Sequence, residues 1–157
     1  MSVRLCFIRQ EYFETHNDFV KMLDVGNASK QSQRTHLCLV VERNSNSFFI
    51  PLRNNLGDPI RKYGRIGHSV PSEKRARAGL DFRYTLVVND NSSIEEVSER
   101  KITKRQLKVI ESDYVKICNE FETYLNGYIK AAKRGKADRI PLYRESSLVN
   151  FHRELGI

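Results

Sequence analysis

The residue types that are rare in the chain limit the class of protein it can belong to. The 157 residues include no tryptophan and three cysteines, Cys6, Cys38 and Cys118. An odd number of cysteines at such wide spacing matches neither a disulfide framework nor a zinc-ligand pattern. Cys6 and Cys38 lie in apolar stretches, so we expect buried, reduced thiols at both positions.

Long apolar runs are also missing. No stretch approaches the roughly 20 residues of a membrane-spanning helix, and the N-terminus lacks the apolar core of a signal peptide. Apolar residues make up 39% of the chain and charged residues 29%, an ordinary composition for a globular protein. We therefore expect one cytoplasmic domain covering residues 1–157, with no membrane partner.

Motifs for nucleotide binding and zinc hydrolysis are absent as well. The chain has no G-x-x-x-x-G-K-[ST], G-x-G-x-x-G, H-E-x-x-H or G-x-S-x-G. Asp90 with Glu99-Arg100-Lys101 superficially matches the D…E-x-K pattern of Mg²⁺-dependent nucleases. Asp90 falls in a predicted turn, however, and the chain lacks the strand–helix–strand order of those enzymes, which disfavours this interpretation. We expect no metal and no cofactor.

What the chain does have is positive charge in one place. The formal net charge is +8, and residues 53–83 contain eight basic residues against three acidic ones. A concentrated basic segment favours a polyanionic partner, because each neutralised phosphate releases counterions. The alternative is a solvated basic loop that keeps the protein soluble. We favour nucleic acid, and the cations predicted to contact RNA here are Arg65, Arg75, Arg77 and Arg83.

The N-terminal two thirds of the chain alternates apolar runs with turn residues. The apolar runs Leu37–Val41 and Phe48–Leu52 flank an Asn/Ser-rich turn and predict an antiparallel hairpin. Pro51 should mark a strand end or a sheet edge. The other expected elements are a strand over Val3–Ile8, a helix over Gln10–Leu23, polar loops over 28–33 and 54–74, a strand over Asp81–Val88 and a possible edge strand within Ile94–Ile102.

The sequence pattern of the C-terminal third predicts helices. Thr103 and Gln106 have the spacing of a capping box, and the apolar spacing that follows predicts a helix from Lys104 to Arg134. Such a helix would be about 46 Å long, in a domain roughly 35–40 Å across. We therefore expect a break or bend near Ser112-Asp113 or Gly127. Cations at its end, Lys133, Arg134 and Lys136, either complement the helix dipole or form a second RNA-binding patch. A last helix is expected over Ser147–Leu155.

One stretch combines a strand with reactive side chains. Phe48–Leu52 is apolar, and the chain then continues as Arg53-Asn54-Asn55. A strand end holds side chains more rigidly than a free loop does, although a buried strand followed by an ordinary turn is the simpler interpretation. Metal-free RNA cleavage uses the ribose 2′-OH as nucleophile, so the protein only orients the backbone, stabilises charge and moves protons. The residues suited to this are Arg34, Arg53, Asn54, Asn55, His68 and Lys74; the same set would serve an RNA-binding surface.

Several motifs in order resemble the ToxN/AbiQ family, the endoribonuclease toxins of type III toxin–antitoxin systems, and its TenpN branch in particular. The first three are a strand that runs into a Tyr-containing helix (Leu5 to Tyr12), Arg34 before an apolar strand, and a strand that ends in Pro51-Leu52 and is followed by a polar run. The other two are the segment Pro71–Arg83 and a short last helix with Leu148, Phe151 and His152. The resemblance covers nearly the whole chain.

The resemblance implies a compact α+β fold around a strongly twisted, mostly antiparallel sheet with flanking helices, similar to the Kid/MazF toxins. It implies metal-independent cleavage of cellular or phage RNA, leaving a 2′,3′-cyclic phosphate and a 5′-hydroxyl. It also implies inhibition by a small, repeated, structured antitoxin RNA, such as a pseudoknot. The toxin processes this RNA and keeps it bound in a closed hetero-oligomer, and a role in phage defence is typical.

By motif position, Tyr12, Arg34 and the Arg53-Asn54-Asn55 run fall on the family's active-site groove. The better-known branch has hydroxyl residues and a lysine after Pro-Leu, so those roles do not transfer to this chain. We hypothesise that Arg53 binds the scissile phosphate, that Asn54 and Asn55 orient it, and that His68, Lys74 or Tyr12 transfers protons. The alternatives are a non-enzymatic RNA-binding protein and, less favoured, a Mg²⁺-dependent nuclease.

Overall fold

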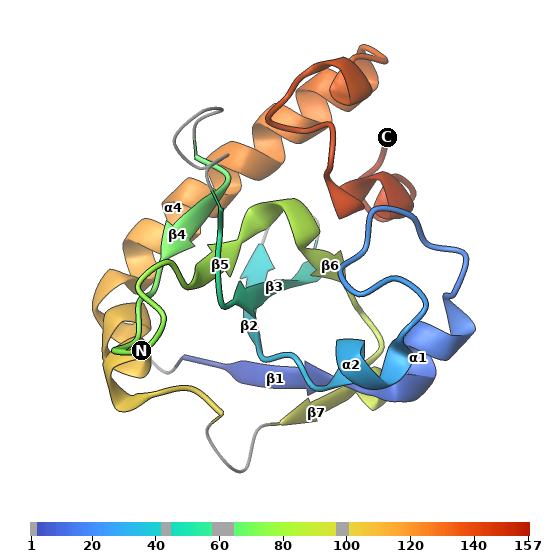
Figure 1. The fold of residues 1–157 in the computed structure, drawn as a ribbon. Helices are drawn as coiled ribbons and strands as arrows, with labels where there is room; N and C mark the ends of the chain where they lie inside the picture. Colours follow the sequence, from blue (N-terminus) through green and yellow to red (C-terminus); the bar gives the residue numbers. More distant parts are fainter. Residues whose placement is uncertain (1–2, 42–44, 58–64, 97–100) are drawn as a thin grey trace.

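A seven-stranded sheet organises the molecule (Figure 1), a computed structural model that describes residues 3–41, 45–57, 65–96 and 101–157. The strand order is β4-β5-β3-β2-β1-β7, and β6 also pairs with β3. Within the described ranges every strand pairing is antiparallel. The strands are β1 (Leu5–Ile8), β2 (His36–Val41), β3 (Asn46–Arg53), β4 (Gly67–Ser69), β5 (Gly79–Asp81), β6 (Leu86–Val87) and β7 (Ile94–Glu96).

The predicted hairpin is confirmed as β2 and β3, whose register runs from His36 opposite Pro51 to Val41 opposite Asn46. The expectation that Pro51 lies at a strand end or sheet edge is wrong, because β3 is a central strand. On its second side β3 pairs with β6 at Phe48 and Phe49, and with β5 at Leu52 and Arg53. Pro51 lies between these two partners, where its missing N–H removes no ladder bond.

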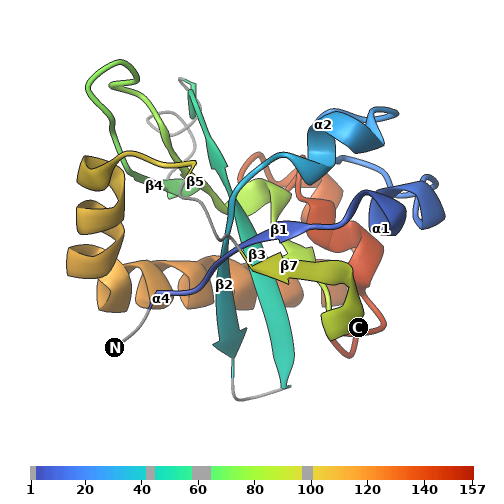
Figure 2. The same ribbon diagram turned by 90° about the horizontal axis from the view of Figure 1, so that it is seen from below.

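The sheet is strongly twisted, as the sequence resemblance implied. Figure 2 shows β1 and β7 crossing β2 and β3 at a steep angle, so the sheet turns sharply from one edge to the other. Two short helices, α1 (Gln10–Thr15) and α2 (Ala28–Ser32), lie together with the C-terminal segment on one side of the strands. The α+β fold with a twisted antiparallel sheet is therefore confirmed.

The long helix α4 (Lys104–Lys133) begins at the predicted capping box. The Gln106 backbone N–H donates to Thr103 Oγ1 over 3.1 Å, and the Thr103 N–H donates to Gln106 Oε1 over 3.2 Å. All 30 residues are helical, so the chain has no break near Ser112-Asp113 or at Gly127. The bend that was expected as the alternative to a break is present: Figure 2 shows that the first turns run at an angle to the rest of the helix.

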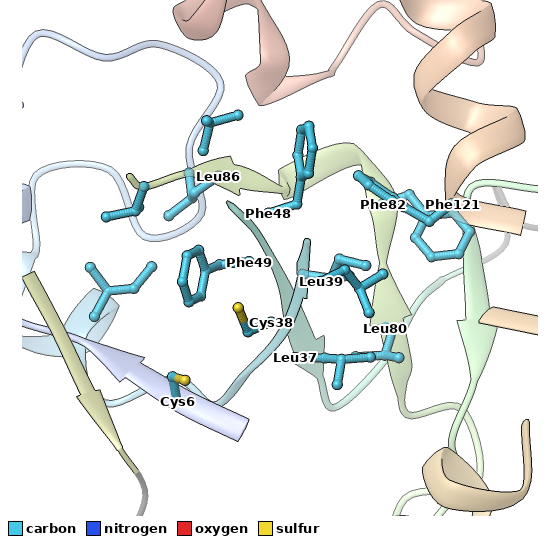
Figure 3. Packing of buried hydrophobic residues seen from close by; sticks show 14 of the residues in the cluster. Cys6, Leu37, Cys38, Leu39, Phe48, Phe49, Leu80, Phe82, Leu86 and Phe121 are labelled. Carbon is cyan, nitrogen blue, oxygen red and sulfur yellow. The ribbon is translucent and has the colours of Figure 1, made fainter. Parts of the chain in front are cut away.

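One face of α4 packs onto the sheet. Ile110, Ile117, Phe121, Tyr124 and Tyr128 are buried along it. Figure 3 shows aromatic rings meeting at this contact: the Phe121 ring lies 5.2 Å from the Phe48 ring and 5.7 Å from the Phe82 ring. Burying each such side chain stabilises the fold by about 1.5–3 kcal/mol. The apolar spacing read from the sequence therefore identified the core-facing side of the helix.

Several element boundaries differ from expectation. The helix predicted over Gln10–Leu23 ends at Thr15, and Lys21 and Asp24 further on adopt positive φ angles of 55° and 53°, which a helix does not permit. The stretch expected to be a polar loop over 28–33 contains α2, whose N-terminus is capped by the Asn27 side chain. The long polar loop contains β4, because Gly67–Ser69 pairs with β5.

The later elements are shorter than predicted. The strand expected over Asp81–Val88 is divided by a 3₁₀ helix, η1 (Phe82–Tyr84), between β5 and β6. The edge strand proposed within Ile94–Ile102 exists as β7, preceded by η2 (Asn91–Ser93). After α4 come η3 (Ala137–Arg139) and η4 (Ser147–Phe151), a 3₁₀ helix in place of the expected Ser147–Leu155 helix.

Some sequence expectations fall on residues outside the described ranges, among them Arg61 and Lys62 of the basic segment and Glu99-Arg100 of the nuclease-like pattern. Cys6 and Cys38 are free thiols in the core, as expected. In the ranges that the structure describes, no helix combines the length and the apolar character needed to cross a membrane.

Candidate nucleic-acid interface

A cationic groove runs beside the end of β3. One hollow of about 300 Å³ adjoins a second of about 440 Å³, and both are bordered by Asn54 and Gln106. Among the described residues, seven lysine or arginine side chains line the two hollows, and the carboxylate there is that of Glu73. The cations are Lys30, Arg34, Lys74, Arg75, Lys101, Lys104 and Arg105. We call this surface the basic groove; its positive charge suits a phosphate backbone.

Four parts of the chain build the basic groove: α2 with the turn after it, the end of β3, residues 72–75, and the start of α4. Gln106 ties the start of α4 to Val70, which lies two residues before the 72–75 segment. Its buried side chain donates from Nε2 to the Val70 carbonyl over 3.0 Å while completing the capping box. The positive end of the α4 dipole therefore lies at the groove, where it favours anions.

Arg34 forms part of the groove wall. Its Nη2 contacts Asp24 Oδ2 at 2.9 Å, and its Nη1 donates to the Leu52 carbonyl over 3.2 Å. Burial raises the pKa of Asp24, but hydrogen bonds and charge from Arg34 and Lys30 outweigh burial and hold that pKa below its ordinary value. The Arg34 guanidinium is thus fixed in place at the border of the groove.

Arg53 and Arg83 converge on one buried carboxylate. Asp81 is fully buried and accepts from Arg53 Nη1 at 3.0 Å, from Arg83 Nε at 3.0 Å and from Arg83 Nη2 at 2.9 Å. Both guanidinium groups also lie 5.3 Å from the centre of the Tyr84 ring. Arg83 is 9% exposed, and neither arginine lines the basic groove among the described residues. The two side chains brace the strand end that carries Asn54.

His68 is held by acids on α4. Its Nδ1 lies 2.8 Å from Glu120 Oε2 and its Nε2 lies 2.9 Å from Asp113 Oδ2, and the ring is 6% exposed. Glu120 Oε1 also accepts from Arg65 Nη1 over 2.8 Å. Both ring nitrogens and the Arg65 guanidinium therefore bind protein carboxylates, and this network ties β4 to α4.

Tyr12 lies in the core. Its ring packs against Phe13, His16 and Phe19, and burial raises the pKa of its hydroxyl above the ordinary range. A buried phenol with a raised pKa does not exchange its proton readily at neutral pH. The structure does not bring Tyr12 to the lining of the basic groove.

The structure brings three of the predicted residues to the groove besides Arg34: Asn54, Lys74 and Arg75. Asn55 follows Asn54, and its Oδ1 accepts from the Gly57 N–H over 2.8 Å, so its side chain closes a turn. Arg77 is exposed, and its carbonyl accepts from the Leu56 N–H over 2.9 Å. Residues 72–78 thus run beside the strand end.

Lys133, Arg134 and Lys136 lie at the opposite end of α4 from the basic groove (Figure 1). The 30 helical residues between these ends span about 45 Å along the chain. The predicted RNA-binding cations therefore divide into two separate surfaces.

Sequence reasoning missed part of the groove: Lys30, Lys101, Lys104, Arg105 and Gln106. The capping box correctly placed the start of α4, but no local pattern indicated that this start packs beside the end of β3. The start of α4 is tied to the residue after β4 by the Gln106–Val70 hydrogen bond, which joins residues 36 apart.

The nuclease-like pattern does not assemble in the described part of the chain. Asp90 Oδ1 accepts from the Ser92 N–H and hydroxyl and caps η2, while Lys101 lies over the Phe7 ring. Glu99 lies outside the described residues. Within the described ranges, no group of three His, Cys, Asp or Glu side chains is placed to hold a metal ion.

Two solved structures share this fold. One is a toxin of a bacterial type III toxin–antitoxin system, in which a non-coding RNA pseudoknot selectively inhibits the toxin. It superposes on this chain with a TM-score of 0.60 and 15% sequence identity, over 80% of this chain and 79% of that one. The other is AbiQ, a lactococcal anti-phage endoribonuclease of the type III class, with a TM-score of 0.55 and 18% identity over 79% and 81% of the two chains. No family model and no curated protein sequence matches the chain.

Proposed function

We propose that this protein is an endoribonuclease toxin of a type III toxin–antitoxin system, acting on RNA bound in the basic groove. The observation that carries the proposal is the groove itself: seven cations around the end of β3, in a fold shared with two type III toxins.

The chemistry proposed is cleavage by the ribose 2′-OH, without a metal. Asn54 and Arg75 hold the phosphate, and the ammonium group of Lys74 stabilises the charge of the phosphorane or moves a proton. Of the three residues hypothesised to transfer protons, Lys74 is the one that lines the groove; His68 binds two carboxylates and Tyr12 is buried. Arg53 acts as a positioning residue through Asp81.

The partner proposed is a small, structured, repeated antitoxin RNA that the toxin cuts and keeps bound. Two separate cationic surfaces support this. The basic groove lies at the start of α4, and Lys133, Arg134 and Lys136 lie at its end. A closed assembly of alternating toxin and RNA requires each toxin to contact RNA at two places, which such an arrangement provides.

The test is to incubate the purified protein with total RNA in EDTA and to identify the new ends. We expect 2′,3′-cyclic phosphate and 5′-hydroxyl ends. Cleavage only after Mg²⁺ is added would contradict the mechanism. Binding without cleavage under either condition would establish the non-enzymatic RNA-binding alternative instead.

A further inference from the structure

We propose that a second pocket, beside the basic groove, binds a single unpaired nucleobase of the RNA. The inference rests on the proposed function, because the strand that delivers the base lies in the basic groove. The pocket has a volume of about 220 Å³ and lies between α1, the loop after it and α2. Its lining includes Phe13, His16, Asn17, Phe19, Met22 and Gln31.

The size and lining of this pocket suit one base. Its volume is below the roughly 300–1,000 Å³ typical of drug-sized ligands, so it admits one small ring system. Aromatic rings and the Met22 side chain supply apolar surface. Among the described residues that line it there is no lysine or arginine, so it suits a neutral base better than a phosphate. Bases splayed out of single strands characteristically stack on such rings.

Polar atoms at the pocket provide contacts for the edge of a base. His16 Nδ1 lies 2.7 Å from the Tyr12 carbonyl, which only accepts, so Nδ1 carries a proton and Nε2 remains available. Gln31 donates from Nε2 to the Leu23 carbonyl over 2.9 Å, which leaves its Oε1 as an acceptor. Asn17 is exposed and adds an amide with both a donor and an acceptor.

The pocket is held open by the rest of the molecule. The loop that walls it is fixed to the C-terminal segment at Val20, whose backbone N–H and carbonyl both bond to the Asn150 side chain, over 2.9 and 2.8 Å. Lys21 Nζ donates to the Arg144 carbonyl over 2.5 Å. The His16 ring is itself packed against two tilted aromatic rings, with its centre 4.3 Å from that of Tyr12 and 4.8 Å from that of Phe19. A ligand therefore finds a formed site.

The pocket lies close to the basic groove, with a narrow hollow between them. A narrow hollow shares Phe13, Met22 and Gln31 with the pocket, and it shares Arg34 with the groove. The Nε atom of Arg34 is buried at this junction and has no hydrogen-bond partner in the described structure. Arg34 borders both the groove and this hollow, so a strand in the groove passes close to the pocket.

The test is equilibrium binding of fluorescein-labelled octamers by anisotropy. The strands are the four homopolymers and a base-free strand, all 2′-O-methylated so that none has the nucleophilic 2′-OH. We expect wild type to bind at least one homopolymer about tenfold or more tighter than the base-free strand, since stacking one base contributes that much. Phe19→Leu and the exposed Asn17→Ala should reduce this preference and leave binding of the base-free strand unchanged.

Controls separate this proposal from the proposed function. Asn119→Ala removes an exposed amide on α4 and should match wild type, whereas Lys74→Ala should weaken all five strands alike. Equal binding of base-containing and base-free strands would overturn the base pocket and leave the basic groove intact. Pocket variants that weaken the base-free strand as much as the homopolymers would overturn it too. No binding to any strand would overturn both proposals.

Discussion

At the scale of single residues, burial separates the polar side chains that stabilise the fold from those that are free to contact a ligand. Arg83, His68 and Tyr12 carry reactive or cationic groups that a sequence alone cannot distinguish from a site. In the fold, Arg83 binds Asp81, His68 binds Asp113 and Glu120, and Tyr12 packs among aromatic rings. Asn54 and Lys74 were predictable as groove residues because they follow a strand end and lie in a polar segment.

Asp81 gives the first prediction at this scale. Replacing Asp81 with Asn should destabilise the protein by about 3 kcal/mol, since two arginines would lose the carboxylate that compensates their charge. Arg53→Ala should cost less, because Arg83 still pairs with Asp81. Urea denaturation measures both changes, and equal stability of Asp81→Asn and wild type would refute the bracing role.

His36 gives a second prediction. Burial lowers its pKa to about 4, although its Nδ1 contacts the Arg34 carbonyl at 3.0 Å. The unfolded chain takes up a proton on this ring below its ordinary pKa of 6.5, while the folded protein does so only near pH 4. Stability contributed by the neutral ring is therefore complete above pH 6.5 and is lost as the pH falls towards 4.

The measurement compares wild type with His36→Gln, which does not titrate. From pH 7 to pH 5 the free energy of unfolding of wild type should fall by about 2 kcal/mol more than that of the variant. Carboxylates titrate in both proteins, so their contribution cancels in the difference. Parallel pH profiles would show that His36 is not buried in its neutral form.

At the scale of elements, regular amphipathic patterns were predictable and short irregular ones were not. The β2–β3 hairpin and α4 follow from apolar spacing and a capping box. The early end of α1 and the pairing of β4 depend on non-local contacts, such as the Asn150 bonds to Val20 and the register of Gly67 with Asp81. Such contacts join residues far apart in sequence, so no local window contains them.

Helix α4 supplies the prediction at this scale. A Cβ atom added at Gly127 would lie 1.8 Å from the Tyr143 hydroxyl oxygen and 2.9 Å from Cζ. Gly127→Ala should therefore destabilise the protein by about 1–3 kcal/mol, although alanine favours helix by about 1 kcal/mol over glycine. Thermal or urea unfolding measures the change.

Two further variants isolate the cause. Asn126→Ala, at the exposed neighbouring position, should be neutral or slightly stabilising. In a Tyr143→Ala background, Gly127→Ala should become stabilising, because the clash is gone and the helix preference remains. Destabilisation of the same size in both backgrounds would show that Tyr143 is not the obstacle.

At the scale of the whole molecule, positive charge gathers from parts of the chain that are distant in sequence. The basic groove takes cations from residues 30–34, 74–75 and 101–105. The sequence indicated Arg34 and the middle group, whereas Lys30 and the cations of residues 101–105 reach the groove only through the fold.

RNA binding should therefore depend steeply on salt. For a single strand, the logarithm of the affinity falls with the logarithm of salt concentration by about 0.7 for each phosphate neutralised. Replacing Lys104 and Arg105 together with alanine should reduce this slope by about 1.4. Titrations of a 2′-O-methyl octamer at several salt concentrations measure it, and an unchanged slope would place the strand elsewhere.

Metal-free cleavage of RNA in the basic groove can be measured directly. The experiment is single-turnover cleavage of RNA in EDTA by wild type, Lys74→Ala and Lys116→Ala. Lys116 is an exposed lysine on α4 outside the groove lining and serves as the matched control. We expect cyclic phosphate ends from wild type, a rate about 100-fold lower for Lys74→Ala, and a wild-type rate for Lys116→Ala. A wild-type protein inactive in EDTA, or a Lys74→Ala variant as fast as wild type, would contradict metal-free cleavage in the basic groove.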